Sequence, residues 1–146
     1  RRAVLFDSSV YIQALQASTP FIASSQALPS GSVLWLSAVV LEELYAGTSG
    51  RDRQVVERLE RDFSKLNRIL VPNLSDWTWV GRVLAQLGAK YGYEQIGRGR
   101  LTNDALIAMS AGRQGIAVLT TNVRDFARIA EFRPFHWEKV NTVRGS

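Results

Sequence analysis

The sequence predicts an α/β domain in which a central, mostly parallel sheet is flanked by helices. Short apolar runs alternate with longer stretches whose apolar residues recur every three or four positions, which is typical of parallel strands joined by helices. The chain has 146 residues, and its 46% hydrophobic content suits a globular domain with one core. We therefore expect residues 1–146 to form a single domain.

Strands are expected where a short apolar run ends at a polar or turn residue. The first, at residues 3–6, is apolar throughout, as expected for a strand that is covered on both faces. It ends at Asp7, so this carboxylate is expected at the carboxyl end of a strand. The same reasoning predicts further strands at residues 33–36, 69–71, 117–120 and 135–140.

Helices are expected between these strands, and capping residues mark several of their ends. One follows Asp7 through Leu15, and Ser37 is a candidate N-cap for a helix that ends before Gly47. The amphipathic stretch 52–68 predicts a helix whose apolar stripe serves either the core or an interface. Further helices are expected after caps at Ser75 and at Thr102 or Asn103, and loops are expected at residues 18–32 and 92–100.

Several function classes are excluded by what the sequence lacks. It has no cysteine, so disulfides, thiolate metal sites and a cysteine nucleophile are excluded, and its one histidine, His136, lies between two aromatic residues. A Ser-His-Asp triad, a histidine-ligated zinc and a glycine-rich phosphate loop are therefore not expected. The opening apolar run is too short for a signal peptide or a membrane span, so we expect a cytoplasmic protein without membrane association.

The chain is basic, with a net charge of +5. From residue 98 onward, eight Lys and Arg residues stand against four acids, so this part of the chain carries a surplus of four positive charges. Polyanions are therefore plausible partners. Phosphate contacts are expected from arginines close to the candidate acids described below, because guanidinium groups suit phosphate: Arg98, Arg100, Arg124 and Arg128.

Acidic side chains stand where a parallel sheet gathers its ligands. Asp7 ends the first strand, and Asp125 follows the fourth. Glu43 and Asp104 lie on helical faces that are otherwise apolar or small. Each acid also has an ordinary explanation, since Asp104 favours a helix dipole, Asp125 caps a helix or Glu43 pairs with an arginine.

Taken together, the four acids favour a metal site. Separate carboxylates that converge at one sheet edge repel one another unless a cation lies between them. Oxygen ligands without His or Cys select hard cations, so Mg²⁺ or Mn²⁺ is expected. Such sites commonly act on phosphate esters, where the metal activates water and neutralises developing charge.

Four segments in order along the chain carry these acids. They are VLFDSSVYI with Asp7, LSAVVLEELYAG with Glu43, GRGRLTNDALIAMSAG with Asp104 and AVLTTNVRDFARI with Asp125. Together they resemble the PIN-domain family, in particular the VapC-type ribonuclease toxins of bacterial toxin-antitoxin pairs. The resemblance implies a doubly wound PIN-like α/β fold whose acidic cluster binds Mg²⁺ or Mn²⁺ and hydrolyses RNA phosphodiester bonds.

The resemblance also implies a role for each matching position. Asp7, Glu43 and Asp104 match the three core metal-site acids, and Asp125 matches a more variable fourth. Glu42 competes with Glu43, which we prefer because it stands in the family's E-L-x-x-G pattern. The supporting positions are Ser8, Thr120, whose hydroxyl matches one that orients an acid, and Asn122, where many PIN domains carry an acid.

Partners are implied in the same way. Similarity to VapC toxins implies a homodimer and a VapB-like antitoxin that blocks the site with an inserted peptide. Two alternatives remain open: a non-catalytic nucleic-acid-binding module on a degenerate PIN scaffold, prompted by Asn122, and a PIN nuclease that processes RNA without toxicity.

Overall fold

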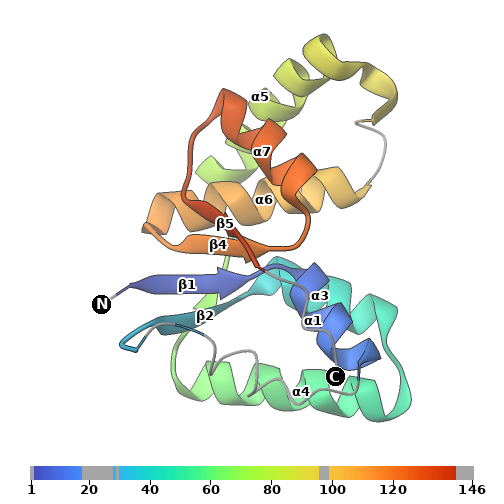
Figure 1. The fold of residues 1–146 in the computed structure, drawn as a ribbon, viewed down its shortest axis with the longest axis vertical. Coiled ribbons are helices and arrows are strands. Elements are labelled where there is room, and N and C mark those ends of the chain that lie inside the picture. Colours follow the sequence, from blue (N-terminus) through green and yellow to red (C-terminus); the bar gives the residue numbers. More distant parts are fainter. Residues whose placement is uncertain (1, 18–27, 29, 96–98, 141–146) are drawn as a thin grey trace.

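The fold is a parallel sheet between two layers of helices (Figure 1). The computed structural model describes residues 2–17, 28, 30–95 and 99–140. Within these ranges the sheet has five strands in the order β3-β2-β1-β4-β5, and every neighbouring pair is parallel. The strands are β1 (Ala3–Phe6), β2 (Val33–Ser37), β3 (Ile69–Leu70), β4 (Ala117–Thr120) and β5 (Trp137–Lys139).

The helices lie on both faces of this sheet, as the α/β prediction requires. On one side are α1 (Ser8–Gln16), α3 (Ala38–Gly47) and α4 (Gly50–Lys65) (Figure 1). On the other side are α5 (Leu74–Tyr91), α6 (Gly99–Gln114) and α7 (Val123–Phe132), and a short 3₁₀ turn (Tyr93–Gln95) follows α5. None of the helices in the described ranges combines the length and apolar character that crossing a bilayer requires.

The central strand sets the position of the candidate site. β1 pairs with β2 on one side and with β4 on the other, so the chain winds outward in both directions from β1. Val4 and Leu5 are fully buried because helices cover both faces of the strand. In open α/β sheets such a reversal of strand order leaves a crevice beyond the carboxyl ends of the strands. Asp7 lies at this end of β1.

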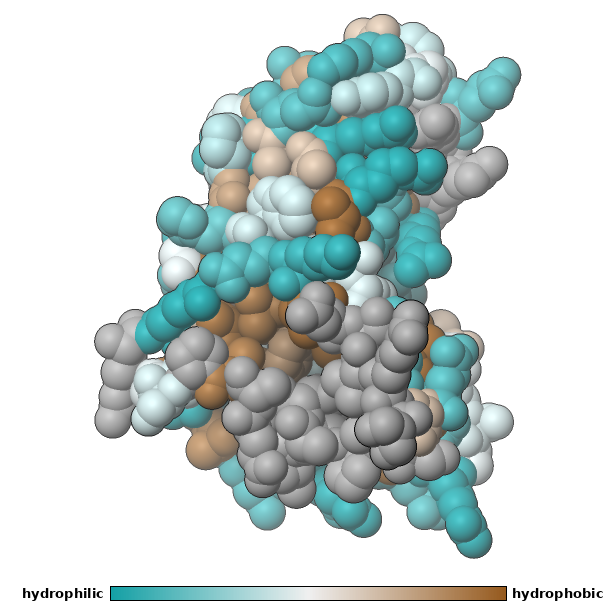
Figure 2. Space-filling model, viewed as in Figure 1, coloured by the Kyte–Doolittle hydropathy of each residue, from teal (hydrophilic) through white to brown (hydrophobic). Residues whose placement is uncertain are grey.

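The predicted strands and several helix ends agree closely with the structure. Ser37 caps α3, because its hydroxyl accepts a hydrogen bond of 3.1 Å from the amide of Val39. The amphipathic stretch forms α4, and its apolar stripe contributes Val56 and Phe63 to the core. Figure 2 shows a patch of apolar side chains near the middle of the visible face.

Other element boundaries differ from the prediction. α5 is capped by Asn73 instead of Ser75, because Asn73 and Asp76 exchange side-chain hydrogen bonds with each other's amides at 2.9 Å. α6 begins at Gly99, ahead of the expected cap at Thr102 or Asn103, and Gly47 lies inside α3 instead of following it. The predicted loop at 92–100 contains the 3₁₀ turn and the start of α6, and most of the predicted loop at 18–32 lies outside the described residues.

Candidate functional site

Asp7 is a buried carboxylate at the carboxyl end of β1. Its amide donates to the carbonyl of Leu119, which ties it to β4, and only 2% of its surface is exposed. The Ser9 hydroxyl donates to Oδ1 at 2.6 Å, and the Thr120 hydroxyl donates to Oδ2 at 2.7 Å. Both carboxylate oxygens are therefore held by hydroxyl groups, one from α1 and one from β4.

Burial and hydrogen bonding act in opposite directions on Asp7. Burial raises its pKa because it removes water from the charged form. The hydroxyls of Ser9 and Thr120 and the positive charge of Arg100 lower the pKa by stabilising that form. The balance leaves the pKa of Asp7 above its usual value. A nearby cation would lower it, because a positive charge stabilises the ionised carboxylate.

Glu43 reaches the same region from α3. Its Oε1 is buried and has no hydrogen-bond partner within the described residues. Burial raises the pKa of Glu43, as do the negative charges of Glu42 and Asp7, while the Ser8 hydroxyl and the Asn103 amide lower it. A buried carboxylate oxygen without a partner is costly, so this atom lacks a ligand that a cation could provide.

Glu42 has a different environment from its neighbour. It is exposed, and its Oε2 accepts a hydrogen bond of 3.3 Å from the Asn103 amide. The pKa of Glu43, by contrast, is raised by the negative charge of Asp7. The geometry therefore favours Glu43 over Glu42 as the acid of this helix that belongs to the cluster.

Asp104 joins the cluster from α6, with only 2% of its surface exposed. Burial and the negative charges of Asp7, Glu43 and Asp125 raise its pKa to about 8, and Arg100 acts in the opposite direction. Four carboxylates from four separate segments thus lie close enough to repel one another.

Asn122 connects the acids at the N-terminus of α7. Its side-chain amide donates to Oδ2 of Asp104 at 3.2 Å and to Oδ2 of Asp125 at 3.1 Å. Its backbone N–H donates to the Thr120 hydroxyl at 2.8 Å, and that hydroxyl in turn holds Asp7. The neutral side chain of Asn122 therefore supplies hydrogen bonds to two of the acids.

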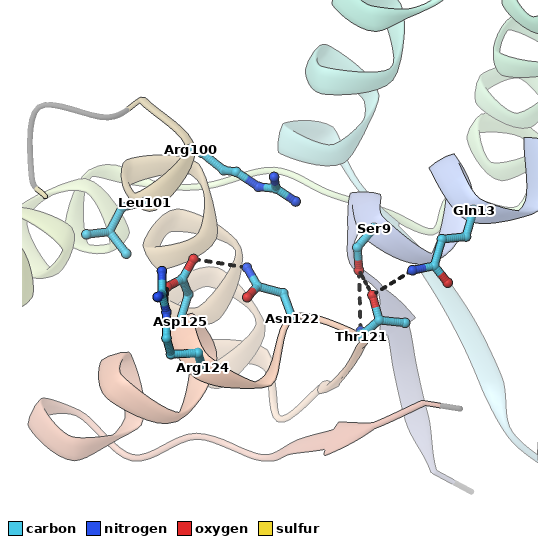
Figure 3. A pocket seen from close by; sticks show the side chains of 8 residues that line it. All are labelled: Ser9, Gln13, Arg100, Leu101, Thr121, Asn122, Arg124 and Asp125. Atoms are coloured by element: carbon cyan, nitrogen blue, oxygen red, sulfur yellow. Dashed lines mark hydrogen bonds and ion pairs between the residues drawn. The ribbon is translucent and has the colours of Figure 1, made fainter. Parts of the chain in front are cut away.

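A polar pocket of about 540 Å³ opens beside the acids (Figure 3). On one side of it, the Gln13 amide donates to the Thr121 hydroxyl at 3.3 Å, and that hydroxyl bonds to Ser9 at 2.8 Å. On the other side, Arg124 lies 3.5 Å from Asp125. The lining residues are Ser9, Gln13, Arg100, Leu101, Thr121, Asn122, Arg124 and Asp125.

The sequence model of the PIN-domain family matches residues 4–132, which is most of the chain. The chain belongs to the PIN-domain family. The predicted resemblance to the PIN-domain family and the predicted fold class are both confirmed by this match and by the parallel sheet. No curated protein sequence matches the chain.

Solved structures share this PIN fold over almost their whole length. A chain of DNA-bound VapBC from Salmonella typhimurium matches with a TM-score of 0.67 and 23% identity, covering 95% of this chain and 98% of the other. Promoter-bound VapBC2 from Rickettsia felis matches with a TM-score of 0.67 and 21% identity, covering 95% and 99%. FitAcB from Neisseria gonorrhoeae matches with a TM-score of 0.59 and 24% identity, covering 95% and 97%. At these identities the likeness establishes the fold.

The donor atoms of this PIN domain fit a hard divalent cation. All four acids offer oxygen, and the Glu43 oxygen lacks a partner. As they stand, however, no three acidic or histidine side chains in the described ranges are placed to hold one ion together. Asp7 is bonded to two hydroxyls, and Asn122 bonds Asp104 and Asp125. Binding an ion therefore requires these side chains to turn toward one another.

The expected phosphate-binding arginines separate into three groups. Arg100 and Arg124 line the pocket. Arg128 lies one turn farther along α7, where its guanidinium stacks 4.1 Å from the centre of the Tyr91 ring. Arg98 lies outside the described residues.

Three polar residues of the site were missed by the sequence analysis. Ser9, Gln13 and Thr121 form a hydrogen-bonded series that ends on Asp7. Ser9 could have been found, because a residue two positions after a strand-end acid lies in the first turn of the next helix. Thr121 and Gln13 could not, because their contact joins residues 108 positions apart.

Proposed function

We propose that this chain is a single-domain, Mg²⁺- or Mn²⁺-dependent endoribonuclease that hydrolyses RNA phosphodiester bonds and acts as the toxin of a VapBC-type toxin-antitoxin pair in the cytoplasm. The observation that carries the proposal is the convergence of Asp7, Glu43, Asp104 and Asp125 beside a pocket lined by arginine. The sequence has no cysteine that could serve as a nucleophile, and its one histidine, His136, lies between two aromatic residues.

The four acids are the proposed metal ligands. A bound divalent ion would activate a water molecule and neutralise charge that develops on the phosphate. The hydroxyls of Ser9 and Thr120 orient Asp7 through its two carboxylate oxygens. Glu43 contributes the buried oxygen that lacks a partner.

The positive side chains at the pocket are the proposed phosphate contacts. Arg100 exerts a favourable electrostatic effect on both Asp7 and Asp104, so it lies near the proposed metal ligands. Arg124 is exposed on the same pocket, and Asp125 would keep its hydrogen bond from Asn122 if Arg124 turned to a phosphate. Arginine suits this role because its N–H donors match two phosphate oxygens at once.

Partner proteins form the second half of the proposal. The similar chains from Salmonella typhimurium and Rickettsia felis belong to VapBC assemblies bound to DNA. By analogy we propose that this chain forms a homodimer and binds a VapB-like antitoxin. A reading frame for a small DNA-binding protein beside the gene, whose co-expression relieves growth arrest, would support the toxin role against a housekeeping role in RNA processing.

The catalytic proposal is tested with conservative substitutions of the acids. Asp7→Asn, Glu43→Gln and Asp104→Asn should each abolish Mg²⁺-dependent RNA cleavage while thermal unfolding remains cooperative. Combining them should cost little more than one alone, because residues that act as a unit are non-additive. The control is Asp52→Asn, which removes an exposed carboxylate on α4.

Two results would reject the catalytic proposal. Cleavage by the Asp7→Asn variant would show that the cluster does not carry the chemistry. RNA binding that EDTA does not weaken, together with no cleavage at any Mg²⁺ or Mn²⁺ concentration, would identify a non-catalytic binding module instead.

A further inference from the structure

A row of positive side chains stacked on aromatic rings lies along the surface where α5 packs against α7. Arg133 lies 3.6 Å from the centre of the Trp79 ring, and Arg82 lies 4.8 Å from the same ring. Farther along α5, Arg128 and Lys90 lie 4.1 and 5.1 Å from the centre of the Tyr91 ring. We call this row the cation–aromatic strip, and its members are Trp79, Arg82, Lys90, Tyr91, Arg128 and Arg133.

The cation–aromatic strip is continuous with the candidate site. α7 begins at the pocket, where Arg124 and Asp125 line the opening. Arg128 follows Arg124 by four residues and therefore shares its helical face. Arg133 follows the last turn, about 14 Å from Arg124 along the helix axis. A chain that leaves the pocket along α7 would pass Tyr91 first and Trp79 next.

Positive charge dominates this surface. The carboxylates that α5 and α7 contribute outside the site are Asp76 and Glu131. Asp76 is buried against Arg113, while Glu131 pairs with Lys90 and accepts a hydrogen bond from the Tyr91 hydroxyl. Four cations and one exposed acid leave the strip three charges positive. In Figure 2, the half of the molecule built from α5, α6 and α7 shows mostly hydrophilic side chains on the visible face.

The chemistry of the strip fits a single nucleic-acid strand. An arginine that stacks on a ring keeps its N–H donors in the plane of the guanidinium, where they can reach phosphate oxygens. Neither Arg82 nor Arg133 forms a salt bridge within the described residues. Half-buried aromatic rings with cations beside them are what single-strand-binding surfaces use to hold bases and backbone.

We propose that the cation–aromatic strip binds the RNA strand on one side of the cleaved bond and leads it into the pocket. This inference rests on the proposed function for its ligand, but it assigns a separate surface with separate residues. The strip contributes affinity for long RNA and takes no part in the hydrolysis itself.

The test neutralises the two exposed arginines together, as Arg82→Gln with Arg133→Gln. Affinity for labelled single-stranded RNA is measured by fluorescence anisotropy in EDTA, so that no cleavage occurs, over a range of salt concentrations. The slope of log K against log salt should become shallower by about 1.4, because each lost phosphate contact accounts for about 0.7. Affinity for RNA of about 16 nucleotides should fall, and affinity for about 4 nucleotides should not.

Two matched variants control for charge and for folding. Arg51→Gln with Arg58→Gln makes the same change in net charge on α4, which lies on the other side of the sheet (Figure 1), and should leave the slope unchanged. Arg82→Lys with Arg133→Lys keeps the charges and should restore the slope. Because Lys lacks the planar stacking surface, Trp79→Leu should then weaken binding less in this background than in the wild type.

Three outcomes decide the matter. An unchanged slope in the Gln variant, with normal thermal unfolding, overturns the inference. Loss of self-association in sedimentation, with RNA affinity unchanged, also overturns it and assigns the strip to a second copy of this chain. If the wild-type protein binds long RNA through the strip but cleaves none, the proposed function fails while the strip stands.

Discussion

The Thr120 hydroxyl donates to Oδ2 of Asp7 at 2.7 Å, although the two residues are 113 positions apart in the chain. The same hydroxyl accepts a hydrogen bond of 2.8 Å from the backbone N–H of Asn122, while it donates its own hydrogen to Asp7. One threonine thereby sets the orientation of the central acid and of the segment that carries Asn122. This relationship depends on β1 and β4 being neighbours in the sheet.

We expect Thr120→Val to weaken Mn²⁺ binding by about 10- to 100-fold, as loss of a partner that orients a ligand typically does. Valine keeps the shape and the β propensity of threonine but removes the hydroxyl. The Asp7 carboxylate and the backbone N–H of Asn122 therefore each lose a hydrogen-bond partner. Isothermal titration with Mn²⁺ measures the effect. Thr120→Ser should restore affinity, and wild-type affinity in the valine variant would contradict the assigned role.

Glu43→Gln and Glu42→Gln should behave differently although the residues are adjacent. Glu43 has the buried oxygen, and the negative charge of Asp7 raises its pKa, whereas Glu42 is exposed. We expect cleavage to be lost in Glu43→Gln and to stay close to the wild-type rate in Glu42→Gln. The reverse result, measured on the same RNA with the same Mg²⁺ concentration, would exchange their roles.

The stability of the metal-free protein should fall as pH rises from about 4 to about 8. The fold raises the pKa of Asp104 to about 8, from 3.8 for an aspartate in an unfolded chain. The folded state therefore binds more protons than the unfolded state within this window, so deprotonation favours unfolding. Asp7, Glu43 and Asp125 add to the effect because they face Asp104, and Arg100 opposes it.

The melting temperature, measured in EDTA across this pH range, checks that prediction. Asp104→Asn should flatten the dependence, since asparagine carries no charge to bury. Saturating Mn²⁺ should raise the melting temperature most at the upper end of the range. A melting temperature that rises with pH in EDTA would contradict the assignment of an elevated pKa to Asp104.

Asp76→Ala should destabilise the fold without touching the site. Asp76 is buried, pairs with Arg113 at 3.0 Å and caps α5 together with Asn73. We expect a loss of about 3 kcal/mol in the free energy of unfolding, at the low end for buried pairs because Arg113 keeps access to water. Urea denaturation measures it, with Asp52→Ala as the exposed control costing under about 1 kcal/mol. Equal losses in the two variants would contradict the structural role of the pair.

The sequence predicted the parts of the site that depend on local pattern. Asp7 ends an apolar run, and Asp104 interrupts an otherwise apolar helix face, so both were recognisable without a structure. Parallel strands bring their carboxyl ends to one edge, which is why convergence of the acids could be expected.

Contacts between distant elements could not be predicted. Arg128 was expected near the acids because Asp125 is close in sequence, yet it stacks on Tyr91 of α5. Nothing in the residues around Arg128 specifies that α5 packs beside α7. Likewise, the Asn73 cap was missed because Ser75 is an equally good capping residue, and only the reciprocal bond with Asp76 decides between them.

The position of β1 between β2 and β4 also has a consequence for the order of events during translation. Asp7 is synthesised 113 residues before Thr120, whose hydroxyl holds one of its carboxylate oxygens. A nascent chain has no complete acid cluster until β4 has been synthesised and has paired with β1. We therefore expect fragments that stop before β4 to lack the RNA cleavage that is proposed for the whole chain.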